Sequence, residues 1–178
     1  MNFKAVYFLF NSLIFLIACE QKEEDVLPIS KWSQEESIRM NSTFAAEEIE
    51  AIDSYLKRRP DWRIKKTGTG LYYFIYESTE NESPVVGDVV WVNFTTSLLN
   101  NNICYSSKRG EPESFMIEKS DIESGIHEGV QLMSVGEKAK FILPSHLAHG
   151  LIGDLDEIPP METVIYDVEL LKIDRQND

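Results

Sequence analysis

Apolar residues near the start of the chain recur with the spacing of a helix. Ser33-Gln34-Glu35-Glu36 has the pattern of a capping box, in which the serine oxygen and a glutamate carboxylate bind free N–H groups at a helix start. Apolar side chains then follow at intervals of seven, four, three and four, which places them on one face: Ile38, Ala45, Ile49, Ile52 and Leu56. Pro60 is expected to end the helix because proline lacks the N–H. One helix, or two helices broken near Asn41-Ser42-Thr43, would both fit the pattern.

The rest of the chain reads mainly as short strands. Apolar and polar residues alternate, and aromatic and β-branched residues are frequent, which is typical of strands with one buried face. The predicted strands are residues 71–76, 88–97, 103–106, 113–117, 137–143 and 163–173. Asn100-Asn101-Asn102 is expected to form a hairpin turn because Asn tolerates the left-handed conformation.

One short helix and one long loop interrupt the predicted strands. Ser120-Asp121-Ile122-Glu123 has the pattern of a second capping box, which predicts a helix that continues through Met133. Its apolar face would be Ile122, Ile126, Val130 and Met133. Residues 144–161 are predicted to form a loop, and loops of that length in a compact domain are usually functional.

Residues 1–18 have the features of a signal peptide. Lys4 is followed by an apolar run from Ala5 to Ala18, which is short for a membrane-spanning helix. The run ends in Leu16-Ile17-Ala18-Cys19, which resembles a bacterial lipobox. That resemblance implies cleavage before Cys19, lipidation of this residue and attachment of the mature chain to a membrane surface. An ordinary secretory signal with a chance cysteine is the alternative.

Residues 19–31 are expected to be a polar, acidic tether. Lys22-Glu23-Glu24-Asp25 resembles the surface-export signal of Bacteroidetes lipoproteins, and the alternative is a solvated acidic segment. Without Cys19, Cys104 is the remaining cysteine, so no intramolecular disulfide is expected. Cys104 is therefore interpreted as a half-buried structural thiol.

Charge and composition exclude several classes of function. The net charge of −13 argues against nucleic acid as a partner, because phosphates recruit Lys and Arg. His146 and His149 lie near Asp154 and Asp156, but a zinc site needs three or four converging ligands. No metal is expected, and without a glycine-rich phosphate loop no other cofactor is expected either.

Three blocks of sequence resemble the FK506-binding-protein family of peptidyl-prolyl cis/trans isomerases. They are Gly129-Val130-Gln131-Leu132-Met133-Ser134-Val135-Gly136, Ile158-Pro159-Pro160 and Tyr166-Asp167-Val168-Glu169-Leu170-Leu171. The resemblance implies an α+β fold in which a bent antiparallel sheet wraps around one short helix, preceded here by a helical extension. The implied divisions are a signal peptide at 1–18, a tether at 19–31, a helical extension with one strand at 32–80 and an isomerase domain at 81–178.

The resemblance also implies a proline-binding pocket between the helix and the sheet. The positions carried over are Phe94, Ile122, Glu123, Ile126, His149, Ile158 and Tyr166. The apolar members would hold the proline ring, the Glu123 N–H would bind the substrate carbonyl, and His149 would assist. Five positions depart from the family pattern: Cys104-Tyr105 replaces a Phe-Asp pair, Glu113 a wall aromatic, Ile126 a floor Trp and His149 a loop Tyr. These changes imply a less aromatic pocket with weaker activity.

The expected function is a lipid-anchored peptidyl-prolyl isomerase that assists folding or assembly of cell-envelope proteins. The lipobox, Trp62 and Thr67-Gly68-Thr69-Gly70 resemble gliding-motility-associated lipoprotein isomerases of Bacteroidetes. Its partners would be proline-containing polypeptides, with the lipid in the outer membrane, at the periplasmic face or the cell surface. The alternatives are a non-catalytic chaperone and a structural subunit of a membrane machine. The oligomeric state stays open, because the Ile38–Leu56 face would suit either a dimer or the chain's own core.

Overall fold

The computed structural model describes residues 33–108 and 110–175. The predictions for the signal peptide, Cys19 and the tether lie outside the described residues. The chain divides into two compact units, residues 1–39 and 40–178. In the described part of the chain, no helix combines the length and the apolar character needed to cross a membrane.

The N-terminal helix is a single element, α2, that spans Gln34–Lys57. Its predicted capping box is confirmed, since the Ser33 N–H donates to Glu36 Oε2 at 2.8 Å and the Glu36 N–H donates to Ser33 Oγ at 3.2 Å. The helix continues through Asn41-Ser42-Thr43 without a break and ends before Pro60, as expected from the missing proline N–H.

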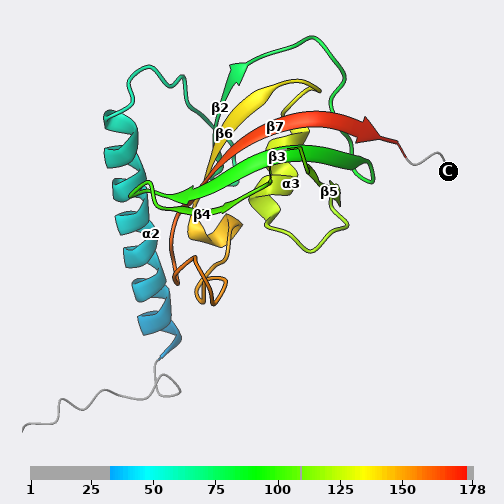
Figure 1. The fold of residues 1–178 in the computed structure, drawn as a ribbon. Helices are drawn as coiled ribbons and strands as arrows, with labels where there is room; N and C mark the ends of the chain where they lie inside the picture. Colours follow the sequence, from blue (N-terminus) through cyan, green and yellow to red (C-terminus); the bar gives the residue numbers. More distant parts are fainter. Residues whose placement is uncertain (1–32, 109, 176–178) are drawn as a thin grey trace, which may run out of the picture. The chain divides into compact units, whose positions relative to one another are not determined.

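The remainder is an α+β fold built on one antiparallel sheet (Figure 1). The strands are β1 (Lys65–Lys66), β2 (Tyr72–Glu77), β3 (Val89–Leu98), β4 (Ile103–Ser106), β5 (Glu113–Met116), β6 (Lys138–Leu143) and β7 (Val164–Asp174). Their order is β1-β2-β6-β7-β3-β4, and β5 also pairs with β3. Figure 1 shows the sheet curving over helix α3 (Ser124–Gln131). A 3-10 turn, η2, spans Ser145–Leu147. The predicted fold class and strand positions are confirmed.

The main core lies between α3 and the inner face of the sheet. Ile126 and Val130 of α3 pack with Phe141 and Leu143 of β6 in one buried cluster. Two glycines let the helix approach the sheet closely: a Cβ at Gly125 would lie 2.6 Å from Leu143 Cγ, and one at Gly129 would lie 3.0 Å from the Phe141 ring. Helix α3 therefore packs directly against β6, with no side chain at Gly125 or Gly129 to separate them.

A smaller core covers part of the outer face. Ile52 and Tyr55 of α2 are buried against Tyr72, Ile142 and Ile165 of the sheet. The predicted apolar face is only partly correct, because Ile49 remains 44% exposed. Tyr55, three residues after Ile52, is buried in this core although the predicted face did not include it.

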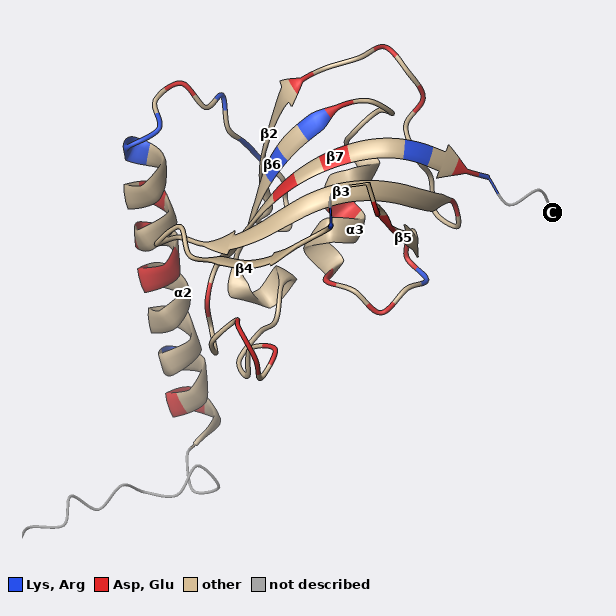
Figure 2. Cartoon of the chain, viewed as in Figure 1, with Lys and Arg blue, Asp and Glu red and all other residues tan. Residues whose placement is uncertain are grey.

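The outer face also carries alternating charges, which Figure 2 shows as blue on β6 beside red on β7. Lys140 of β6 forms an ion pair with Asp167 of β7, and Lys138 lies 3.1 Å from Glu77 of β2. The Tyr76 hydroxyl donates to Asp167 at 2.7 Å. These charged pairs lie on the outer face of the sheet. Because successive side chains of a strand point to opposite faces, the apolar pocket lies on the inner face.

Candidate functional site

An open pocket of about 250 Å³ lies between the start of α3 and the inner face of the sheet. Its lining residues come from β3, β4, β5, β7, α3 and the segment that leads into α3. They are Val92, Phe94, Thr96, Tyr105, Glu113, Ser114, Phe115, Ile122, Glu123, Ile126, Val130, Tyr166 and Val168. Five of the predicted site residues are brought together here: Phe94, Ile122, Glu123, Ile126 and Tyr166.

An aromatic wall closes one side of the pocket. The rings of Phe94 and Tyr166 lie 6.0 Å apart with their planes tilted by 43°. Strands β3 and β7 are paired so that Thr96 lies opposite Tyr166, and Phe94 is two residues before Thr96 on the same face. Because both rings stand on central, fully paired strands, the wall is rigid.

Glu123 is placed by a turn rather than by the predicted capping box, which is wrong. The helix begins at Ser124, and its N-cap, Glu123, makes no side-chain capping hydrogen bond. Ser120 Oγ instead accepts the Met116 N–H at 3.0 Å, and the Glu123 carboxylate is drawn to Tyr166. Buried His127 braces this turn, since its Nδ1 accepts the Glu118 N–H at 3.0 Å and its Nε2 lies 3.0 Å from the Ser120 carbonyl oxygen.

A polar cluster lies at the rim of the apolar pocket. The Tyr166 hydroxyl donates to Glu123 Oε1 at 2.6 Å, and His149 Nε2 lies 2.8 Å from the same oxygen. Burial and the adjacent Glu123 charge raise the pKa of Tyr166 well above its ordinary value, so its hydroxyl stays a donor. Thr96 is fully buried and lies opposite Tyr166 in the pairing of β3 with β7, so it belongs to the same end of the pocket.

The backbone of Glu123 has a free donor at the mouth of the pocket. In residues 33–108 and 110–175 its N–H meets no protein acceptor, while its carbonyl accepts the N–H groups of Ile126 and His127. The backbone at Glu123 is extended, with φ −60° and ψ 133°. A substrate carbonyl at the pocket would satisfy this N–H, which otherwise depends on water.

Two predicted site residues are not part of the pocket lining. His149 reaches the pocket only through its contact with Glu123. Ile158 is 1% exposed and packs in the main core beneath the long loop. It therefore supports the loop from below instead of presenting its side chain at the pocket surface.

The loop is held by a carboxylate that sequence analysis missed. Asp154 Oδ1 accepts the N–H groups of Asp156 at 2.9 Å and Ile158 at 2.8 Å, and its Oδ2 accepts the Tyr105 hydroxyl. The hydrogen bond to Asp154, followed by burial, raises the pKa of Tyr105 to about 12. Tyr105 also lines the pocket. The three hydrogen bonds to Asp154, the Asp154 clamp, therefore join the loop to the pocket wall. The only sequence signal was the Asp-x-Asp pattern of a turn.

From the hydrogen bonds of the Asp154 clamp, we expect the loop to lose stability only at acid pH. Burial favours a higher pKa for Asp154, but the hydrogen bonds from Tyr105, Asp156 and Ile158, together with His149, lower it below its ordinary value. The stabilisation is therefore complete above the unfolded pKa of about 4 and is lost as pH falls through the lower folded value. The Asp156 and Ile158 amide chemical shifts should stay constant from about pH 5 to pH 8 and move below about pH 4. Movement near neutral pH would contradict this assignment.

The remaining candidate chemistry is weak. Burial, then the charges of Glu157, Asp154 and Glu162, raises the pKa of the Cys104 thiol, which disfavours the reactive thiolate. Among the described residues, no group of three or more His, Cys, Asp or Glu is arranged to hold a metal ion. The pocket instead combines apolar walls with one free N–H, which suits a ring and its neighbouring carbonyl.

The comparisons with known proteins agree with this class of site. A family model described as FKBP-type peptidyl-prolyl cis-trans isomerase matches residues 80–171. The chain belongs to this family. The crystal structure of FkpA from Escherichia coli matches with a TM-score of 0.63 and 29% identity, covering 80% of this chain and 74% of that one.

Curated relatives give the same family. "Probable FKBP-type peptidyl-prolyl cis-trans isomerase FkpA" from Neisseria meningitidis serogroup B is 32% identical over 86% of this chain and 57% of its own length. FkpA from Escherichia coli K12 is 36% identical over 62% of this chain and 40% of its own length. FK506-binding protein 2 from Yarrowia lipolytica is 39% identical over 52% of this chain and 65% of its own length. In each case the chain spans less than two thirds of the relative.

Proposed function

We propose that this chain catalyses cis/trans isomerisation of Xaa-Pro peptide bonds. The observation that carries the proposal is the free Glu123 N–H at the mouth of an apolar pocket walled by Phe94 and Tyr166. The barrier to rotation, about 18–20 kcal/mol, arises from C–N double-bond character. Removing the amide from water lowers this barrier, because the twisted amide of the transition state has lost that double-bond character. An apolar pocket that fits the twisted amide therefore favours the transition state without an acid or base.

Each side chain has a defined part in this mechanism. Phe94, Tyr166, Ile122 and Ile126 surround the proline ring, and the Glu123 N–H holds the carbonyl of the bound chain. His149 and the Tyr166 hydroxyl fix the Glu123 carboxylate, which orients the turn that carries this N–H. Ile158 anchors the long loop in the main core.

The test is the relaxation of a short Xaa-Pro peptide from cis to trans in the presence of the full chain. Uncatalysed exchange takes about tens to hundreds of seconds, so catalysis is easily resolved. Faster relaxation, together with faster refolding of a protein limited by proline isomerisation, would support the proposal. An unchanged peptide rate at high protein concentration would exclude isomerase activity.

We further propose that the protein acts in the cell envelope as a lipoprotein anchored through Cys19. The lipobox-like Leu16-Ile17-Ala18-Cys19 supports this location, and the helical extension before the isomerase core supports the gliding-motility-associated subfamily. Its substrates would then be proline-containing envelope proteins, including those of a gliding or secretion apparatus. Loss of this protein should impair assembly of such an apparatus.

Cys19→Ser is expected to abolish lipid attachment while leaving isomerase activity intact. The thiol at position 19 is the proposed acyl acceptor, whereas the pocket begins more than seventy residues later, at Val92. Labelling with a radioactive fatty acid, followed by separation of membrane and soluble fractions, measures the effect. Equal labelling of both proteins would contradict the assignment.

A non-catalytic chaperone is the second candidate function. Glu113 and Tyr105 favour it, because they line the pocket where the family pattern has a wall aromatic and an Asp. A polar wall grips a proline ring less tightly. Capture of an unfolded protein without any effect on peptide isomerisation would select this alternative.

A further inference from the structure

A second and larger groove lies on the other side of the long loop. Its volume is about 500 Å³. Helix α2, the turn η2 and the segment before β7 form its walls. The lining residues are Asn41, Phe44, Ala45, Glu47, Glu48, Ala51, Leu99, Ser145, His146, Leu151, Met161, Glu162 and Thr163. None of them lines the proline pocket, so the groove is a separate cavity.

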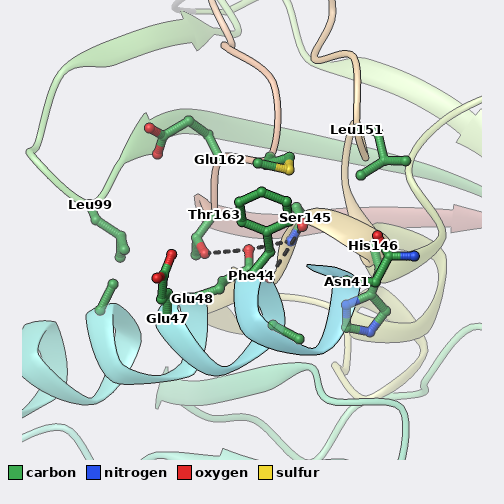
Figure 3. Close-up of a pocket in the computed structure, with 13 residues that line it drawn as sticks. Asn41, Phe44, Glu47, Glu48, Leu99, Ser145, His146, Leu151, Glu162 and Thr163 are labelled. Carbon is green, nitrogen blue, oxygen red and sulfur yellow. Dashed lines mark hydrogen bonds between the residues drawn. The ribbon is translucent and has the colours of Figure 1, made fainter. Parts of the chain in front are cut away.

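A hydrogen-bonded glutamate, Glu48, joins helix α2 to the loop at the groove. Glu48 Oε1 accepts the Ser145 N–H at 2.6 Å and the Thr163 hydroxyl at 2.8 Å, and its Oε2 accepts the Ser145 hydroxyl at 3.2 Å. Figure 3 shows these bonds crossing from α2 to the loop beside the Phe44 ring. On the same loop, His146 Nε2 lies 3.0 Å from the Thr69 carbonyl oxygen. These hydrogen bonds therefore tie α2 and the segment at Thr69 to the loop that lines the groove.

The surface of the groove combines apolar side chains with negative charge. Phe44 is 37% exposed and Leu151 is 69% exposed, and Met161 and Leu99 also line the groove. The described lining residues include three carboxylates, Glu47, Glu48 and Glu162, but neither Lys nor Arg. An occupant that complements this surface carries apolar groups together with positive charge.

We propose that this groove binds an unfolded polypeptide segment in which apolar residues alternate with Lys or Arg, and that proline is not required. The carboxylates would pair with basic side chains of the bound segment, while Phe44 and Leu151 cover its apolar ones. The same carboxylates repel the phosphates of nucleic acids and of anionic lipids.

The groove and the proline pocket are both in contact with one loop, so one bound polypeptide would have access to both sites. Residues 145–163 contribute Ser145, Leu151 and Thr163 to the groove, while His149 of the same loop contacts Glu123 of the pocket. A client held in the groove would raise the local concentration of its prolines near the pocket. Binding in the groove itself does not depend on isomerase activity.

The test is binding of a short fluorescent peptide of alternating Leu and Lys to the full chain, followed by anisotropy. Glu47→Gln should weaken binding about twofold to fivefold, the range expected for one exposed charge pair. Phe44→Ala should weaken it about tenfold, as expected for an aromatic anchor. Added salt should weaken binding further. A matched peptide with Glu in place of Lys should not bind.

Two variants on the same helix serve as controls. Glu50→Gln removes the same charge and Ile49→Ala truncates an equally exposed apolar side chain, but neither residue lines the groove. Both should bind the peptide like the unmodified chain. The proposal is overturned if these controls weaken binding as much as Glu47→Gln and Phe44→Ala, or if the Glu-containing peptide binds equally well.

Further outcomes separate this proposal from its alternatives. Phe94→Ala, in the proline pocket, should leave peptide binding unchanged, and loss of binding in this variant would place the peptide in the pocket and overturn the proposal. Phe44→Ala should leave the sedimentation coefficient unchanged. Dissociation of an assembly by this variant would show that a second copy occupies the groove, which would also overturn the proposal. Because the peptide lacks proline, failure of the isomerase proposal leaves this test intact.

Discussion

Replacing Phe94 with Ala is expected to lower kcat/KM for a short Xaa-Pro peptide by about tenfold or more, the equivalent of at least about 1.4 kcal/mol of transition-state stabilisation. Phe94 is half-buried and lies beside Tyr166 in the aromatic wall of the pocket, with ring centres 6.0 Å apart. Removing its ring widens the pocket and admits water to the amide, which then keeps its planar, conjugated form. Tyr166→Ala should reduce turnover by a similar factor.

Two controls isolate the pocket from the fold in this experiment. Phe74→Ala makes the same truncation on the outer face of the sheet, where Phe74 stacks on Trp62 at 6.2 Å. It should leave kcat/KM unchanged. Tyr166→Phe keeps the ring but removes the hydroxyl that donates to Glu123, so its turnover should fall by less than about threefold. If folded Phe94→Ala protein turned over peptide at the original rate, the aromatic wall would have no part in catalysis.

The strands were predictable because their pattern is local. Residues 103–106 and the turn at Asn101, where φ is 69°, lie where alternation and the tolerance of Asn place them. The first capping box was predictable for the same reason, since Ser33 and Glu36 bind each other. In both cases the residues that decide the structure are neighbours in sequence.

The failures arise where distant residues compete with local ones. Ser120 and Glu123 have the spacing of a capping box, but Glu123 bonds instead to Tyr166, which lies 43 residues further along the chain. Glu48 stands out in no local pattern, yet it accepts the Ser145 N–H across 97 residues of sequence. A single sequence carries no signal for such pairs, because either partner alone looks like an ordinary surface residue.

The pocket was partly predictable for a different reason. Apolar periodicity shows that Phe94 and Ile126 face inward but does not distinguish a pocket wall from ordinary core. The family resemblance supplied that distinction for Phe94, Ile122, Glu123, Ile126 and Tyr166, which do line one pocket. Ile158 does not line this pocket, and its N–H donates to Asp154 within the loop. Thr96 was missed, since it belongs to no local motif.

Gly153→Ala is expected to cause the largest loss that a single added methyl group can produce near the site. Gly153 has φ +68°, and a Cβ there would lie 2.2 Å from the Ile158 carbonyl oxygen and 2.7 Å from the Pro159 carbonyl carbon. Both neighbours are backbone atoms, so the loop itself must move. The displacement would break the Asp154 N–H bond to the Ile158 carbonyl, 3.1 Å long, and withdraw Ile158 from the core.

Gly150→Ala separates the steric effect from backbone conformation. Gly150 lies in the same loop with φ +63°, but a Cβ there would meet no atom within 4 Å. It should cost only the strain of the left-handed conformation, about 1–2 kcal/mol of unfolding free energy. Gly153→Ala should cost clearly more in chemical unfolding and lower kcat/KM by about tenfold or more, since the loop carries His149, which contacts Glu123 of the pocket. Equal losses in the two variants would mean that the loop yields freely around Ile158. In that case the close packing of Gly153 against Ile158 and Pro159 would not be what holds the loop in place.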